Sequence, residues 1–149
     1  MEFIKETPVN IDELVKKANS IYRVERQAAL EEIKKYDCQK SRDVITRLAL
    51  HDKIFGIKNS AFLVAQAMGI TKKGQPIRLT KKDIGYKASD FTKLFLRIKK
   101  EASMDGFELE KFKKHFQILN PEMLDVMSYE KGNKLDSWIE SIFQGLPKK

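Results

Sequence analysis

The sequence predicts an all-α fold of about eight helices in a single domain. Apolar residues recur at helical spacing along most of the chain, and residues typical of helix starts and ends flank these runs. The alternation typical of strands is nearly absent, and only residues 76–79 read as a short extended piece. A chain of 149 residues, with 42% hydrophobic and 34% charged residues, can bury a core without disulfides or a structural metal.

Four helices are expected in the first half of the chain, over about 11–20, 24–36, 41–51 and 56–68. The first begins with Asn10 as its N-cap and Glu13 as the capping-box partner, while Val9 and Leu14 are spaced as a hydrophobic staple. Ser41 is expected to cap the third helix, and Gly69 to end the fourth. The apolar face expected of the second helix consists of Val24, Ala28, Ala29, Ile33 and Tyr36.

These helices pair into two hairpins that resemble each other in sequence. A shift of 32 residues aligns Arg26 with Lys58, Ala29 with Ala61, and Ile33 with Ala65. A shift of 31 residues aligns Asp12 with Asp43, Leu14 with Ile45, and Ala18 with Ala49. A period of this length is typical of a helical solenoid, in which each hairpin buries its apolar face on the next. We therefore expect the two hairpins of residues 10–70 to stack.

The second hairpin resembles a HEAT repeat of the short bacterial kind. Residues 41–48 would form its first helix, Asp52 its turn, Lys58 the basic residue that opens the second helix, and residues 61–69 the packed end. The resemblance covers about residues 10–70 and implies a right-handed α-α superhelix. The first hairpin departs from the pattern, because Asn19-Ser20 stand near the place of the turn aspartate and Tyr36-Asp37 replace the apolar residue and glycine at the end.

Residues 89–149 are expected to add four more helices, of which Ser89, Asn120 and Asn133 cap three. Pro121 suits the first helical position after Asn120. The apolar stripe of the last helix includes Trp138, and Gly145 and Pro147 end that helix.

Most of the net charge of +8 lies in a connector over residues 71–88. There the only acid is Asp83, and the six bases are Lys72, Lys73, Arg78, Lys81, Lys82 and Lys87. Three interpretations remain open: a solvated connector kept soluble by lysine, a surface for an acidic protein, or a segment that neutralises nucleic-acid phosphates. These six residues are the candidate anion-binding site of the sequence.

No catalytic, cofactor or metal site is expected. Cys38, His51 and His115 are too few and too far apart to assemble a metal site. Residues 101–112 place a glycine as a calcium loop does, but Phe112 stands where that loop needs a bidentate glutamate. Glycine-rich phosphate loops and nucleophile motifs are also missing from the sequence, so an enzyme is not expected.

One cysteine, an N-terminus without an apolar leader and no apolar run long enough for a membrane helix predict a cytoplasmic protein. The expected function is that of an interaction module, in which the second helices of the hairpins form a groove for a protein or peptide partner. The alternative is a nucleic-acid-associated protein that contacts phosphates through residues 72–87.

Overall fold

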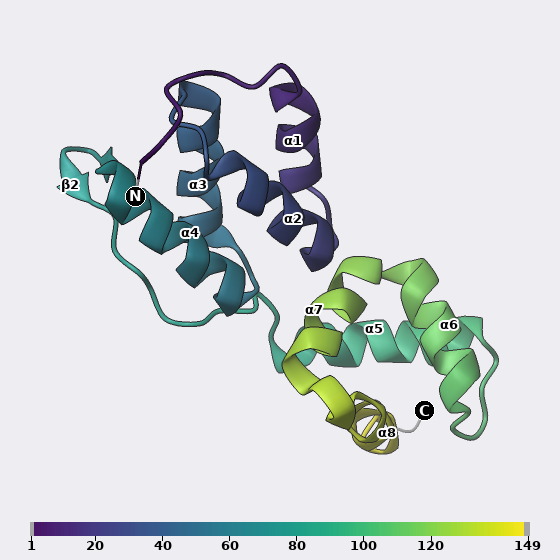
Figure 1. The fold of residues 1–149 in the computed structure, drawn as a ribbon. Helices are drawn as coiled ribbons and strands as arrows, with labels where there is room; N and C mark the ends of the chain where they lie inside the picture. The colour runs from purple at the N-terminus through teal and green to yellow at the C-terminus, as the bar shows by residue number, and fades with distance from the viewer. Residues whose placement is uncertain (1, 148–149) are drawn as a thin grey trace. The chain divides into compact units, whose positions relative to one another are not determined.

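Figure 1 shows the protein as a computed structural model that describes residues 2–147. Most of these residues are helical, so the predicted all-α class is confirmed. The chain forms two compact units, Met1–Ile84 and Gly85–Lys149. The first contains α1 (Ile11–Ala18), α2 (Arg23–Ile33), α3 (Gln39–His51), α4 (Phe55–Met68), β1 (Thr71–Lys72) and β2 (Gln75–Pro76). The second contains α5 (Ala88–Glu101), α6 (Leu109–Leu119), α7 (Pro121–Lys131), the 3₁₀ turn Gly132–Lys134 and α8 (Leu135–Gln144).

In the N-terminal unit, the four helices pack as two neighbouring hairpins. Helix α1 packs on α2 and α3 on α4, while α1 also contacts α3 and α2 contacts α4 (Figure 1). Alanines that correspond in the two hairpins, Ala18 with Ala49 and Ala29 with Ala61, are all completely buried. Small side chains at these places let the helices approach closely. Positions that correspond in the sequence repeat are therefore also buried to the same extent in both hairpins. The superhelical form remains a prediction.

The start of α1 differs from the prediction. Helix α1 begins at Ile11 as expected, but the side chain of Asn10 makes no capping hydrogen bond. Val9 is fully exposed, so it does not form the expected staple with Leu14. The predictions of a capping box and a hydrophobic staple are therefore wrong. Burial of Ile11 and Leu14 stabilises this end of the helix instead.

Two further details of the first four helices were predicted wrongly. Helix α3 begins at Gln39, so Ser41 lies inside the helix, where its buried hydroxyl contacts the Cys38 thiol at 3.2 Å. In α2, Val24 and Ala28 are exposed, and the buried positions are Arg26, Ala29, Leu30 and Ile33. Ala29 and Ile33 are buried as predicted, but apolar spacing alone placed Val24 and Ala28 on the buried side and did not assign Arg26 to it.

The end of α4 is as predicted. Gly69 adopts the left-handed conformation with φ of 67°. The N–H of Ile70 donates to the carbonyl of Ala65 at 3.0 Å and that of Gly69 to Gln66 at 3.0 Å, which is the Schellman arrangement. The next residues form a hairpin that was not predicted: β1 and β2 pair antiparallel around Lys73 and Gly74. Both turn residues have positive φ, 55° and 78°, as a two-residue type I′ turn requires.

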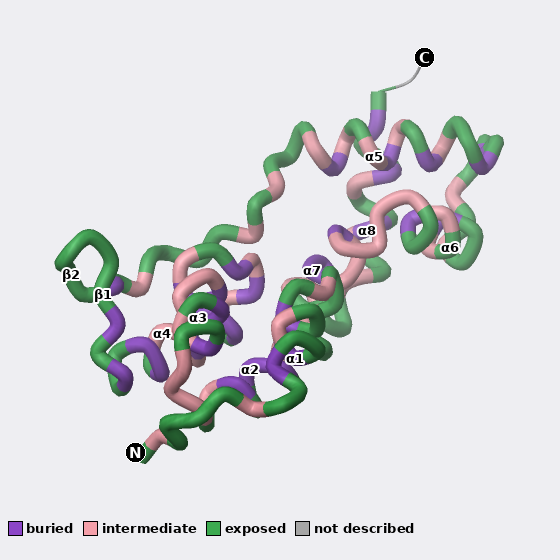
Figure 2. Tube along the Cα trace, turned by 90° about the horizontal axis from the view of Figure 1, so that it is seen from above, coloured by how far each residue is buried: buried purple, intermediate pink, exposed green. Residues whose placement is uncertain are grey.

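The C-terminal unit is built around aromatic side chains. Phe95, Phe112 and Phe116 are completely buried and meet edge to face, with ring centroids 4.7 to 6.2 Å apart. Trp138 is only half-buried and borders this cluster, with its ring centroid 5.7 Å from that of Phe95. Figure 2 shows the buried positions recurring along the helices of both units.

One of the three predicted caps in this unit is confirmed. Asn120 accepts a hydrogen bond from the Met123 N–H at 3.0 Å, and Pro121 occupies the first turn of α7. Helix α5 starts after Lys87 and not at Ser89, because the Asp90 carboxylate accepts the Lys87 N–H at 2.7 Å. Asn133 lies in the 3₁₀ turn that precedes α8, so it does not cap that helix.

Candidate interaction surfaces

A buried ion pair joins the two hairpins of the N-terminal unit. Arg26, on α2, donates from Nε and Nη2 to the two carboxylate oxygens of Asp52 at 2.8 and 3.0 Å. Asp52 lies in the turn between α3 and α4, and it also accepts the Ile54 N–H at 2.9 Å. Both charged side chains are less than a tenth exposed. The bidentate geometry therefore fixes the first hairpin against the turn of the second.

A second arginine makes a similar connection from the opposite direction. Arg47, on α3, donates to the carbonyl of Ala18 at the end of α1, at 3.1 Å. Burial lowers the pKa of Arg47; the nearby Asp52 opposes this shift and Arg26 adds to it. The inter-hairpin contact thus contains two arginines around one aspartate, and its polar groups are placed by four different elements.

The surfaces of α2 and α4 that face solvent carry apolar side chains. On α2, Val24 is 69% exposed and Ala28 is exposed; on α4, Leu63 is 55% exposed and Ala67 is exposed. We call these four residues the outer apolar positions. Because α2 contacts α4, these exposed apolar residues lie on two adjacent helices. The particular residues were not foreseen, since Val24 and Ala28 had been assigned to the core.

All six predicted anion-binding residues are exposed. Lys72 lies on β1, Lys73 in the type I′ turn, and Lys87 just before α5. The remaining three, Arg78, Lys81 and Lys82, lie in the connector of the N-terminal unit. Within residues 2–147, the side chains of Lys72, Lys73, Arg78, Lys81 and Lys87 form no ion pair. The structure thus gathers five of the six in the N-terminal unit, while Lys87 belongs to the other.

The β-hairpin encloses a shallow cavity with the end of α4. The cavity holds about 270 Å³ and is lined by Gln66, Gly69, Ile70, Thr71, Pro76 and Ile77. Ile70 and Ile77 are buried, so the beginning of the connector packs onto the end of α4. None of the lining residues is charged, and the candidate basic residues are therefore not directed into a pocket by this hairpin.

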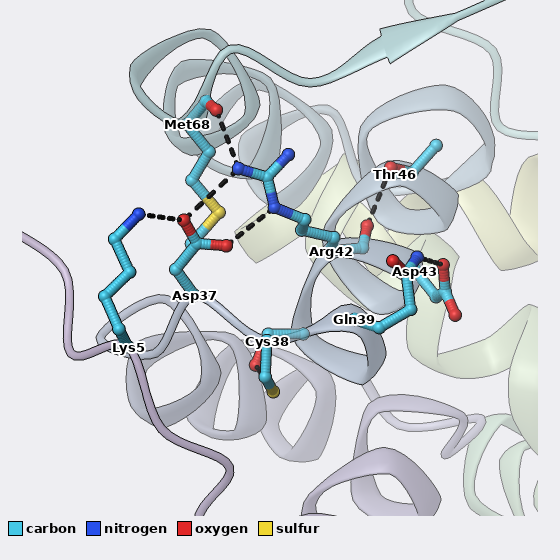
Figure 3. A network of polar contacts seen from close by, with 9 residues as sticks. Lys5, Asp37, Cys38, Gln39, Arg42, Asp43, Thr46 and Met68 are labelled. Carbon is cyan, nitrogen blue, oxygen red and sulfur yellow. Dashed lines mark hydrogen bonds and ion pairs between the residues drawn. The ribbon is translucent and has the colours of Figure 1, made fainter.

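Asp37 organises a polar network at the end of the first hairpin (Figure 3). Its carboxylate accepts from Arg42 at 2.6 and 3.2 Å and from Lys5 at 3.1 Å, and Arg42 also donates to the Met68 carbonyl at 3.0 Å. These hydrogen bonds, first that from Arg42 and then that from Lys5, lower the pKa of Asp37 from an ordinary 3.8 to about 2. The network ties the N-terminal segment, α3 and the end of α4 together, which is a structural role.

Cys38 and His51 lie at opposite ends of α3, and His115 lies in α6 of the other unit. Cys38 precedes α3; burial raises the pKa of its thiol, but hydrogen bonds, above all with Ser41, outweigh this and lower it. The imidazole of His115 contacts the carbonyl of Lys111, one turn earlier in its own helix. No group of three or more metal-ligating side chains converges within residues 2–147.

Comparisons with known proteins add no relative: no family model, curated protein or solved structure matches the chain. Among residues 2–147, none of the helices is both long and apolar enough to traverse a bilayer.

Proposed function

We propose that this protein is a non-enzymatic interaction module, and that a helix or peptide of a protein partner binds across α2 and α4 of the N-terminal unit. The observation that carries this proposal is the exposure of Val24 and Leu63 on two neighbouring second helices. Exposed large apolar side chains cost little when single, but a pair on adjacent helices offers the hydrophobic contacts that helix-in-groove recognition uses.

The architecture supports the same proposal. The two hairpins contact each other first helix to first helix and second helix to second helix. If the hairpins stack as in a helical solenoid, successive second helices line one surface. The Arg26–Asp52 pair supports the proposal as well, because it connects α2 to the turn immediately before α4. A pre-organised surface loses less conformational entropy on binding.

Replacing both Val24 and Leu63 with aspartate is expected to abolish capture of the partner. Tagged wild-type and variant proteins would be purified from the native host, and the proteins that accompany each would be identified by mass spectrometry. Ile118→Asp is the matched control, since Ile118 is 70% exposed on α6 of the other unit. A partner that is lost from the double variant but kept by Ile118→Asp supports the proposal. Retention of every partner by the double variant contradicts it.

A second candidate function is binding to nucleic acid. It is favoured by the exposure of all six basic residues and by the lack of ion pairs at five of them within the described chain. Lysines and arginines that are not neutralised by carboxylates are free to replace the counterions of a phosphate backbone. The β-hairpin carries Lys72 and Lys73 at its tip, where a backbone can be reached without a deep groove.

Neutralising Lys81 and Lys82 as glutamine is expected to weaken nucleic-acid binding and to reduce the slope of log affinity against log salt by about 2. Fluorescence anisotropy with duplex and single-stranded DNA and with RNA, at about 50 and 200 mM salt, measures this. The control removes the same charge from α1 through Lys16→Gln and Lys17→Gln, both exposed positions. Absence of binding by the wild type at the lower salt concentration eliminates this candidate.

A further inference from the structure

A cavity of about 450 Å³ lies within the C-terminal unit, between the residues just before α5, one side of α5 and the start of α7. Its volume falls within the range of small-molecule sites, which is about 300 to 1,000 Å³. The lining combines an aromatic ring, two apolar side chains, two cations and one carboxylate, which belong to Tyr86, Leu94, Met123, Lys93, Arg97 and Asp90.

The two cations of the cavity are free to bind an anion. Lys93 and Arg97 are exposed and lie four residues apart on α5, so they are neighbours on one side of that helix. The ammonium of Lys93 forms no hydrogen bond or ion pair with residues 2–147. Arg97 pairs with Glu101 at 3.4 Å, and an exposed pair of this kind stabilises a protein little. An ammonium beside a guanidinium suits the several oxygens of a phosphate group.

The cavity also offers an apolar surface for a flat ring. Tyr86 lies two residues before α5 and is half-buried, with its ring centroid 6.0 Å from that of the buried Phe91. Phe91 in turn meets Trp138 edge to face, at 5.1 Å between centroids, so the tyrosine ring rests on a packed aromatic cluster. Leu94 and Met123 add apolar contacts. Aromatic rings of this kind are the surfaces on which nucleobases stack in proteins.

Asp90 contributes a hydrogen-bond acceptor near the tyrosine. Its Oδ2 accepts the Lys87 N–H at 2.7 Å, while its Oδ1 accepts no hydrogen bond from residues 2–147. That oxygen can therefore accept a hydroxyl group of a ligand. The helical rise of about 1.5 Å per residue places Arg97 about 10 Å beyond Asp90 along α5. A ligand that contacts both must carry a hydroxyl group at one end and an anion at the other.

We propose that this cavity binds a nucleoside phosphate, with the base on Tyr86, a ribose hydroxyl on Asp90 and the phosphate on Lys93 and Arg97. Each kind of lining group then meets its chemical complement in one ligand. A free nucleotide and the phosphorylated end of a single strand present the same groups. The inference does not rest on the proposed function, because the peptide surface lies on α2 and α4 of the other unit.

Isothermal titration calorimetry of the full-length protein tests the ligand class. Adenosine and uridine 5′-monophosphates are expected to bind about tenfold more tightly than the nucleosides that lack the phosphate, since charge-assisted hydrogen bonds are lost. Each is also expected to bind about tenfold more tightly than inorganic phosphate, which cannot stack on Tyr86. The inference is overturned if neither monophosphate binds, or if either the nucleosides or inorganic phosphate bind as tightly as the monophosphates.

A paired substitution tests the site. Lys93→Gln with Arg97→Gln is expected to weaken binding of adenosine 5′-monophosphate at least about tenfold, and both positions are exposed, so the fold is kept. The control is Lys111→Gln with Lys114→Gln, which removes the same charge from exposed positions of α6 and is expected to bind as the wild type does. Unchanged binding by the first variant overturns the inference, and so does an equal loss in the control, because net charge alone would then explain the affinity.

The source of the nucleotide is separated by a single-stranded oligoadenylate with a 5′-phosphate and its twin without one. The twin controls for attraction between the strand and the basic connector. A preference of about tenfold for the phosphorylated strand, lost in the Lys93 and Arg97 variant, assigns the cavity to the end of a strand. Equal affinity for the two strands, with adenosine 5′-monophosphate still bound, assigns it to a free nucleotide. Both results support the inference.

Discussion

Ala65→Glu is expected to unfold the N-terminal unit or to lower its free energy of unfolding by about 3 kcal/mol or more. Ala65 is 1% exposed on α4, which packs on α3 and contacts α2. A glutamate there would bury a carboxylate that has no counter-charge. Chemical denaturation followed by circular dichroism measures the loss.

Ala67→Glu is the matched control, because Ala67 lies in the same helix but is exposed. Its change in unfolding free energy is expected to stay within about 0.5 kcal/mol, as is usual for surface substitutions. Equal stability of the Ala65 and Ala67 variants would show that the buried face of α4 has been assigned wrongly, and the packing of the second hairpin would have to be revised.

Arg26→Met is expected to destabilise the N-terminal unit by about 3 to 5 kcal/mol. The methionine fills part of the space of the arginine stem, but Asp52 loses both donors at 2.8 and 3.0 Å and remains buried with its charge. The carbonyl of Ser20 also loses the hydrogen bond that Arg26 donates at 3.1 Å. Urea-induced unfolding of the variant and the wild type measures the difference.

A second substitution shows how much of the lost unfolding free energy comes from leaving the Asp52 charge buried without a partner. Asp52→Asn in the Arg26→Met background removes the carboxylate charge while an amide oxygen can still accept the Ile54 N–H. The double variant is expected to recover a large part of the lost stability. If it is no more stable than Arg26→Met alone, the loss comes from packing around the arginine stem and not from the buried charge of Asp52.

The candidate surfaces could be predicted only in part. The basic residues of the connector were identifiable because a run of lysines with one acid is visible in the sequence, and clustered lysines are mostly exposed. The pairing of Arg26 with Asp52 was not predicted, although both lay in the repeat pattern. Its signal was present: a basic residue recurring at positions 26 and 58, and an aspartate in the turn between α3 and α4.

By itself, the sequence determined the helical class, the internal repeat, and those helix ends that require a special backbone conformation or a capping side chain. Helical periodicity, Gly69 with its left-handed φ and the Asn120 cap are local properties, because each depends on the conformation of a few adjacent residues. Tertiary structure alone decided which side of α2 is buried. Val24 is 69% exposed and Arg26 6%, opposite to their hydrophobicity, because Arg26 meets a carboxylate 26 residues away. The burial of a charged residue such as Arg26 therefore depends on the partner that the fold brings to it.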